Sequence, residues 1–174
     1  MMFIKNENIA LRVAEPNDAE VIYRWENDTD IWRVSETTVP YSMHQIQTFL
    51  MSNNDLTSER QLRLMIERLD DKKAVGCIDI YDYDSFNGRA GIGILIDKDC
   101  RRQGYAKQAV ELLKDYCFNI LLLNQLYIYT LANNIESILL FESLGFERCG
   151  IRKQWYKTNE GYLDQIEYQL INIK

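Results

Sequence analysis

The fold of this chain is indicated first by residues 94–106, Ile94-Leu95-Ile96-Asp97-Lys98-Asp99-Cys100-Arg101-Arg102-Gln103-Gly104-Tyr105-Ala106. A β-branched apolar run typical of a strand is followed by a short polar loop and then by helical spacing. A helix N-terminus exposes unpaired N–H groups and a partial positive charge, so it attracts anions. Gly104 lets the backbone approach a phosphate closely, and Arg101 and Arg102 add positive charge. On spacing alone, an anion site and a merely tight loop are equally good interpretations.

Two common nucleotide-binding motifs do not match this loop. A Walker loop needs a second glycine and a Gly-Lys-Ser/Thr ending, and both are missing. The Gly-x-Gly-x-x-Gly pattern of dinucleotide-binding domains does not occur either. The loop therefore indicates neither of these folds.

Outward from this loop, hydrophobic periodicity predicts alternating blocks of strand and helix. The predicted strands cover residues 9–13, 60–67, 74–81, 89–97, 125–131, 146–155 and 162–171. The predicted helices cover residues 15–27, 42–50, 104–117 and 134–144. The order β-α-α-β-β-β-α-β-α-β-β predicts an α/β fold of the mixed α+β kind, in which two successive hairpins form an antiparallel meander.

Length and charge limit the class of protein. The 174 residues are 47% hydrophobic and show no Pro/Gly/Ser-rich linker, so we expect a single domain over residues 1–174. A net charge of −6 argues weakly against a nucleic-acid partner and weakly for an amine substrate, although solubility alone is the stronger explanation. Glycine aside, the apolar runs, such as residues 120–123, are no longer than four residues and are far too short for a membrane span.

Cysteine and histidine usage argues against a metal site. The four cysteines, Cys77, Cys100, Cys117 and Cys149, form no CxxC pair, and His44 is the single histidine. A zinc site needs a denser set of such ligands. A chain of this size can also build a core without disulfides, so reduced cysteines and a cytoplasmic location are expected.

Several motifs resemble the GNAT superfamily of acetyl-CoA-dependent N-acetyltransferases. Residues 101–106 resemble its signature Q/R-x-x-G-x-G/A, and residues 134–146 resemble its later motif N-x-x-S/A…E-x-L-G-F. Residues 89–94 match the strand that precedes the signature. Gly150, Arg152, Gly161-Tyr162 and Asp164, together with Leu11-Arg12 and Asp18-Ala19, are similar to a subgroup that contains ribosomal-protein N-terminal acetyltransferases and spermidine N-acetyltransferase.

The resemblance implies a fold and a set of cofactor contacts. It implies a central, mixed but mostly antiparallel twisted sheet flanked by about four helices. Backbone groups of Leu95 and Ile96 would pair with the pantetheine arm of acetyl-CoA like an added strand. Asn134 would reach the cofactor, although its role as a helix cap explains it equally well. The pyrophosphate would be held by backbone amides of Arg101, Arg102, Gln103, Gly104, Tyr105 and Ala106.

The implied reaction is direct attack of a primary amine on the acetyl thioester. An alkyl ammonium has a pKa near ~10, so a base must first remove a proton. The candidates are Asp79, Asp82 and Glu36, each of which is otherwise explained as a solvated surface acid. His44 is a weaker candidate that is better explained as a surface residue.

Phe141 departs from the family pattern. Many relatives place a tyrosine there to protonate the departing thiolate, and phenylalanine cannot donate a proton. Tyr127, Tyr129 and Tyr156 are alternatives by chemistry only, and solvent is another. Phe141 is then expected to pack against the cofactor.

The acceptor is expected to be a small-molecule amine such as spermidine or a protein N-terminus. Acidic residues in the first helical region, Glu26, Asp28, Asp30 and Glu36, favour a polycation slightly, and Trp25, Trp32 and Tyr41 lie in the same region. A non-catalytic acyl-CoA-binding domain and an aminoglycoside-type antibiotic acetyltransferase are the alternatives. Acetyl-CoA is the expected co-substrate, no metal is expected, and a homo-oligomer is compatible with the sequence.

Overall fold

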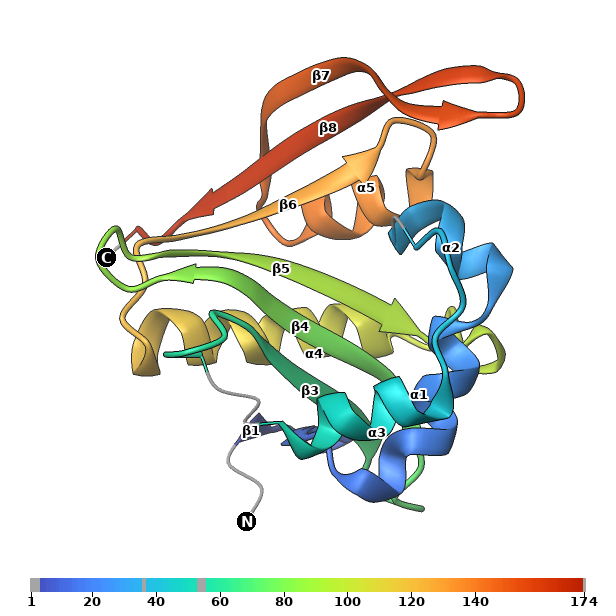
Figure 1. Ribbon diagram of the computed structural model, residues 1–174. Helices are drawn as coiled ribbons and strands as arrows, with labels where there is room; N and C mark the ends of the chain where they lie inside the picture. Colours follow the sequence, from blue (N-terminus) through green and yellow to red (C-terminus); the bar gives the residue numbers. More distant parts are fainter. Residues whose placement is uncertain (1–3, 36, 53–55, 174) are drawn as a thin grey trace.

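A computed structural model describes residues 4–35, 37–52 and 56–173, whose strands form one eight-stranded sheet (Figure 1). The strands lie in the order β1-β2-β3-β4-β5-β6-β8-β7. Their bounds are β1 Ile4–Lys5, β2 Ile9–Val13, β3 Leu62–Arg68, β4 Ala74–Asp84, β5 Arg89–Ile96, β6 Gln125–Leu131, β7 Glu147–Thr158 and β8 Gly161–Ile171. Every neighbouring pair is antiparallel except β5 and β6, which confirms the mixed, mostly antiparallel sheet.

The parallel pair β5–β6 is also the place where the sheet opens. Residues 89–91 of β5 pair with residues 125–127 of β6, whereas β6 pairs with β8 over its whole length. Among the described residues, β5 beyond Gly91 is paired on its β4 side only. The two strands therefore diverge toward the C-terminal end of β5, and Figure 1 shows this divergence.

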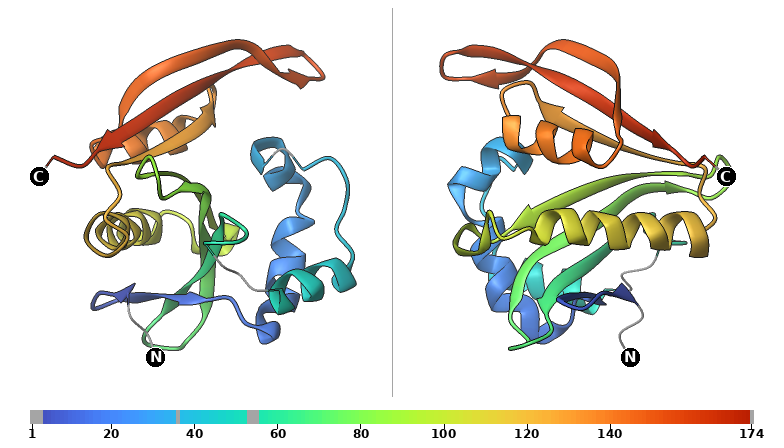
Figure 2. Two further views of the ribbon diagram at one scale, coloured as in Figure 1. Left: turned by 60° about the vertical axis from the view of Figure 1, so that its left-hand side comes forward. Right: turned by 180° about the vertical axis from the view of Figure 1, so that it is seen from behind.

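Helices cover both faces of the sheet (Figure 2). The helix α4, Tyr105–Asp115, and the helix α5, Ile135–Ser143, pack on one face. The helices α1, Ala19–Glu26, α2, Thr29–Ser35, and α3, Met43–Met51, lie on the other. Among the described residues, no helix is long and apolar enough to cross a membrane.

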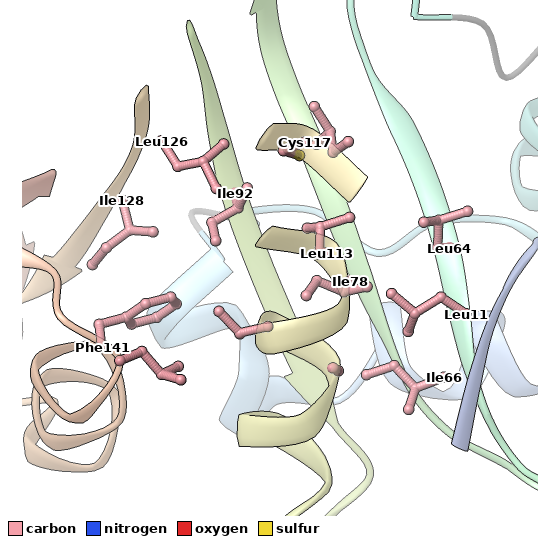
Figure 3. Packing of buried hydrophobic residues seen from close by; sticks show 14 of the residues in the cluster. Leu11, Leu64, Ile66, Ile78, Ile92, Leu113, Cys117, Leu126, Ile128 and Phe141 are labelled. Carbon is pink, nitrogen blue, oxygen red and sulfur yellow. The ribbon is translucent and has the colours of Figure 1, made fainter. Parts of the chain in front are cut away.

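Two hydrophobic clusters follow from this layering. The larger one lies between the sheet and α4 and α5, where Ile78, Ile92, Leu113 and Ile128 pack together (Figure 3). The smaller one lies on the opposite face, where Trp25 of α1 packs with residues of α3, β3 and β4. Burial of apolar surface on both faces supplies the main stabilisation of such an arrangement.

A partly buried arginine, Arg12, ties β2 to β3 and to the residues before α1. The Arg12 guanidinium donates to both carboxylate oxygens of Asp18, at 2.7 and 2.8 Å, and to Glu67 at 2.6 Å. Burial opposes ionisation of Asp18, but the hydrogen bonds from Arg12 and from the backbone of Glu15 lower the pKa of its carboxyl. The pairing places the start of α1 against β2 and β3.

The observed elements differ from the predicted ones in several places, both in their bounds and in elements that were not predicted. The short β1 and α2 were not predicted, and α4 continues as a π-helical turn, η3, over Tyr116–Ile120. At the start of α2, the Asp28 backbone carbonyl accepts from Ile31 N and Trp32 N, and the Asp28 side chain accepts from Asp30 N. Asp28 followed by Thr29 was therefore an available helix-start signal.

Candidate active site

A cavity of about 1160 Å³ occupies the gap where β5 and β6 diverge. One end is lined by the loop that enters α4, and the middle by β5, β6 and α5. The other end is lined by residues of α1, α3, β3 and β4. The cavity thus extends from the loop before α4, which is predicted to bind an anion, to side chains on the sheet face covered by α1 and α3.

The first turn of α4 presents backbone N–H groups at one end of the cavity. Gly104 precedes the helix in the left-handed region, at φ +81°, which glycine adopts without strain. None of the described side chains caps this turn, so its N–H groups are available to a ligand. Added at Gly104, a Cβ would come no nearer than 3.8 Å to a described atom outside the adjoining backbone, the Gln108 Nε2. The space above the turn is open.

Five of the six residues expected to hold the pyrophosphate line this end, namely Arg101, Arg102, Gly104, Tyr105 and Ala106. Gln103 instead lines a smaller hollow on the outer side, together with Tyr105. The Arg101 Nε donates to the Ile96 carbonyl at 3.2 Å, and Arg102 lies 3.5 Å from Glu136 in an exposed pair. Both arginines are therefore only lightly held by the protein.

The Asp97 side chain ties the loop between β5 and α4 to the helix α1. Its buried carboxylate accepts from Trp25 Nε1 at 2.9 Å, from Arg24 Nη2 at 2.7 Å and from Asp99 N at 3.1 Å. Burial opposes ionisation, but the indole and backbone hydrogen bonds and the attraction of Arg24 lower the pKa of the Asp97 carboxyl. Trp25 is thus a core residue that holds the loop rather than part of an aromatic cation site.

The half of β5 that pairs with β4 but not with β6 forms the wall in the middle of the cavity. Leu95 pairs with Cys77 and Ile96 with Gly76 on the β4 side, and both residues line the cavity. In a strand, successive backbone groups point to opposite edges, so some amides and carbonyls of residues 92–96 face the gap. An extended ligand can pair with that edge.

Asn134 and Phe141 lie across the gap on α5. The Asn134 side chain accepts from Ser137 N at 3.2 Å, so it caps the helix, and it also lines the cavity. Phe141 is buried and contacts Phe146 edge-on, with ring centroids 5.1 Å apart. Its position in the cavity wall leaves it able to contact a ligand.

At the opposite end, Asp79 belongs to an ion triad. Arg63 donates to both oxygens of Asp79, at 2.9 Å from Nε and 2.8 Å from Nη2, and donates through Nη1 to Glu26. Burial disfavours the charge of Arg63, but attraction to Asp79 and Glu26 and the hydrogen bonds to Asp79 act together to hold the pKa of Arg63 well above its ordinary value. All three side chains line the cavity.

The other predicted bases lie elsewhere. Asp82 is not among the cavity-lining residues, and its carboxylate lies 3.5 Å from the Tyr127 hydroxyl. Burial and the nearby Asp82 raise the pKa of Tyr127 to about 12. Glu36 lies outside the described residues. His44 is exposed on α3 and does not line the cavity.

Aromatic side chains line the middle of the cavity and its end near α1 and α3. Tyr129, Tyr156 and Tyr41 line the cavity, whereas Tyr127 does not. The Tyr81 ring lies over Gly91, where a Cβ would come within 2.1 Å of Cε2. Tyr81 was not predicted as a site residue, although its glycine partner in the next strand is a sequence signal for close approach.

Arg63 was also missed from the sequence. Residues 62–65 alternate in a way that suggests an outward-facing arginine, but Arg63 faces the cavity with a side chain that is 19% exposed. Because helices cover both faces of the sheet, alternation did not reveal which face meets solvent.

Comparisons with known proteins agree with this geometry. The sequence model of the family described as Acetyltransferase (GNAT) domain matches residues 8–147. An uncharacterised N-acetyltransferase named p20, from Bacillus licheniformis, is 28% identical over 172 residues, covering 98% of this chain and 97% of the relative. Spermidine N(1)-acetyltransferase from Vibrio cholerae serotype O1 is 22% identical over 169 residues, covering 97% and 96%.

A solved structure shares the fold. Spermidine N-acetyltransferase from Vibrio cholerae, in complex with CoA and spermine, superposes with a TM-score of 0.86 at 22% identity. The match covers 95% of this chain and 96% of that chain. This likeness confirms the acetyltransferase fold expected from the sequence.

Proposed function

The chain belongs to the GNAT acetyltransferase family, and on that premise we propose that it transfers an acetyl group from acetyl-CoA to a primary amine. The observation that carries the proposal is the continuous cavity between β5 and β6. It joins an uncapped helix N-terminus to an end lined by carboxylates. An anionic donor and a cationic acceptor would therefore enter from opposite ends and meet in the middle.

Acetyl-CoA would be held mainly by backbone groups. The N–H groups at Gly104 and the first turn of α4 would bind the pyrophosphate, with Arg101 and Arg102 adding positive charge. The open edge of β5 at Leu95 and Ile96 would pair with the pantetheine arm. Backbone N–H groups on the same edge would polarise the thioester carbonyl.

Asp79 is the best-placed base for the amine. It lines the cavity and pairs directly with Gly93 of β5, so its side chain lies beside the strand edge proposed to hold the thioester. A carboxylate can take the ammonium proton, often through a water molecule. Asp82 stands outside the lining, and Glu36 is proposed from the family resemblance alone.

The departing thiolate can be protonated by a group other than residue 141. A thiol pKa of roughly 8.5 makes the thiolate a tolerable leaving group in water. Tyr129 and Tyr156 line the cavity and are the tyrosines that remain from the predicted set. We propose that one of them, or solvent, supplies the proton.

The acidic lining supports a cationic amine, with a polyamine as the favoured class. Glu26, Asp30 and Asp79 line the acceptor end against one arginine, Arg63. The likeness to spermidine acetyltransferases points the same way. Phe141 in place of tyrosine is the one observation that favours a non-catalytic CoA-binding domain instead. A cytoplasmic location is proposed from the four free cysteines.

The test combines calorimetry with a thiol-release assay. CoA should bind the purified protein. Acetyl-CoA should release thiol in the presence of at least one amine of a panel of spermidine, an aminoglycoside and a peptide with a free N-terminus, with spermidine as the favoured acceptor. The Asp79→Asn variant should bind CoA normally and lose turnover by roughly 10²-fold or more, the usual contribution of a general base. CoA binding without release for any amine would favour the non-catalytic alternative, and absence of CoA binding would refute the proposal.

A further inference from the structure

Charged side chains form a row across the sheet that leads away from the strand edge proposed to hold the thioester. Gly93 of β5 pairs with Asp79 of β4, and Asp79 pairs with Arg63 of β3. Directly paired residues point to the same face of a sheet. Glu26 of α1 contacts the far side of the Arg63 guanidinium through Nη1. The order from β5 outward is therefore Gly93, Asp79, Arg63 and Glu26.

Glu26 occupies an unfavourable position for a carboxylate. It is the last residue of α1, where the helix dipole presents its negative end. Its side chain is nevertheless only 17% exposed and lines the cavity. The Trp32 indole donates to the Glu26 carbonyl at 2.6 Å, which fixes the end of the helix. Helix stability does not account for an acid at this position, and Arg63 offsets the repulsion.

Arg63 in turn is fixed from three directions. It binds Asp79 with two parallel hydrogen bonds and Glu26 with one, and its guanidinium lies 5.5 Å from the ring centroid of Phe49 on α3. It thereby ties the helices α1 and α3 to the sheet at the acceptor end. A bidentate arginine is rigid and cannot be replaced by lysine without loss of geometry.

We propose that Glu26 is the specificity-determining residue for a second positive charge on the acceptor, and that Arg63 is the residue that positions it. The inference rests on the proposed acetyl transfer to an amine. Asp79 pairs with Gly93 of β5 and so lies nearest the strand proposed to hold the thioester, which assigns it to the reacting nitrogen. Glu26 lies farther along the row and receives one hydrogen bond from Arg63, through Oε1. The other oxygen can accept a distal ammonium group.

The charge balance supports this division. Two carboxylates and one guanidinium leave the triad with a net charge of −1, and Asp30 adds a further acid to the lining. A distal ammonium would neutralise the triad, whereas a distal carboxylate would be repelled. For acceptors with the same carbon chain, KM should therefore depend on the charge at the end remote from the reacting amine.

The experiment uses acceptors that differ only at that end. Butylamine, 4-aminobutanol and 1,4-diaminobutane are compared with wild type, Glu26→Gln and the control Glu20→Gln, which changes an exposed acid of the same helix. For 1,4-diaminobutane, Glu26→Gln should raise KM by about tenfold with kcat within twofold, as expected for a lost charge-assisted hydrogen bond. For butylamine, KM should not change. Glu20→Gln should behave as wild type.

Arg63 is tested by Arg63→Lys, which keeps the net charge of the triad but loses the bidentate geometry, with CoA affinity and circular dichroism as checks on folding. This variant should lose the preference for the diamine over butylamine while CoA still binds. If the variant does not fold, the Glu26→Gln result decides alone. An equal KM increase for butylamine and the diamine in Glu26→Gln, or no increase, would overturn the inference while acetyl transfer stands. Failure of wild type to acetylate any amine would instead overturn the proposed function.

Discussion

Replacing Asp97 with alanine removes the anchor beneath the loop that enters α4. The Asp97 carboxylate accepts three hydrogen bonds, from the Trp25 indole, the Arg24 guanidinium and the Asp99 backbone N–H. In Asp97→Ala the indole N–H stays buried without an acceptor, because Trp25 is only 4% exposed. The loop also loses the side-chain cap of the short helix η2, Lys98–Cys100.

The expected cost follows from these three contacts. An unsatisfied buried donor costs about 1–3 kcal/mol, and a lost cap costs about 1 kcal/mol. The Arg24 side chain is 66% exposed, so its pair with Asp97 contributes on the order of 0.5 kcal/mol or less. Relief from burying a carboxylate offsets part of the sum, which leaves a loss of about 2 kcal/mol. For a chain of this size the melting temperature should fall by roughly 4–8 °C.

Urea unfolding followed by circular dichroism at pH 7 measures the free energy, and calorimetry measures CoA affinity. Asp97→Ala should lower both, because the loop leads into the turn proposed to bind the pyrophosphate of CoA. Asp97→Asn keeps one acceptor oxygen and should lose about half as much stability. The matched control is Asp99→Ala, an exposed change in the same loop that keeps the backbone donor. If Asp97→Ala unfolded at the same urea concentration as wild type, the anchoring role would be wrong.

Three further predictions follow from buried groups. Burial opposes ionisation of Asp18 and Asp97, but hydrogen bonds outweigh it and lower the pKa of both carboxyls. Their stabilisation is therefore complete above an unfolded pKa of about 3.9 and is lost as the pH falls through the folded values, which urea titrations from pH 6 to pH 2 would show. Gly91→Ala should cost about 1–3 kcal/mol in urea unfolding, because the new methyl overlaps the Tyr81 ring; an unchanged midpoint would contradict the close approach. Cys149 is the exposed cysteine of four, so a thiol reagent should label one site in the native protein and four after unfolding.

Much of the fold was predictable from local patterns. The bounds of β2 and β6 match the predicted segments, and the helix after Gly104 begins where the glycine and the apolar spacing indicated. These features depend on neighbouring residues: backbone freedom at glycine, side-chain capping and hydrophobic periodicity. The anion-binding turn could be proposed from the sequence because a helix N-terminus carries its chemistry in its own backbone.

The acceptor end depended on tertiary structure. Arg63 and Asp79 are 16 residues apart and Glu26 is 37 residues from Arg63, and only the register of β3 against β4 and the docking of α1 bring them together. The alternation of apolar and polar residues within a strand indicates that the strand has two different faces, but it does not indicate which face meets solvent. In this protein helices cover both faces of the sheet. The gap between β5 and β6 likewise arises because β6 follows β8 instead of β5. Such pairings are set by packing between distant segments, so the tertiary structure, rather than any local stretch of sequence, decided where the proposed amine site lies.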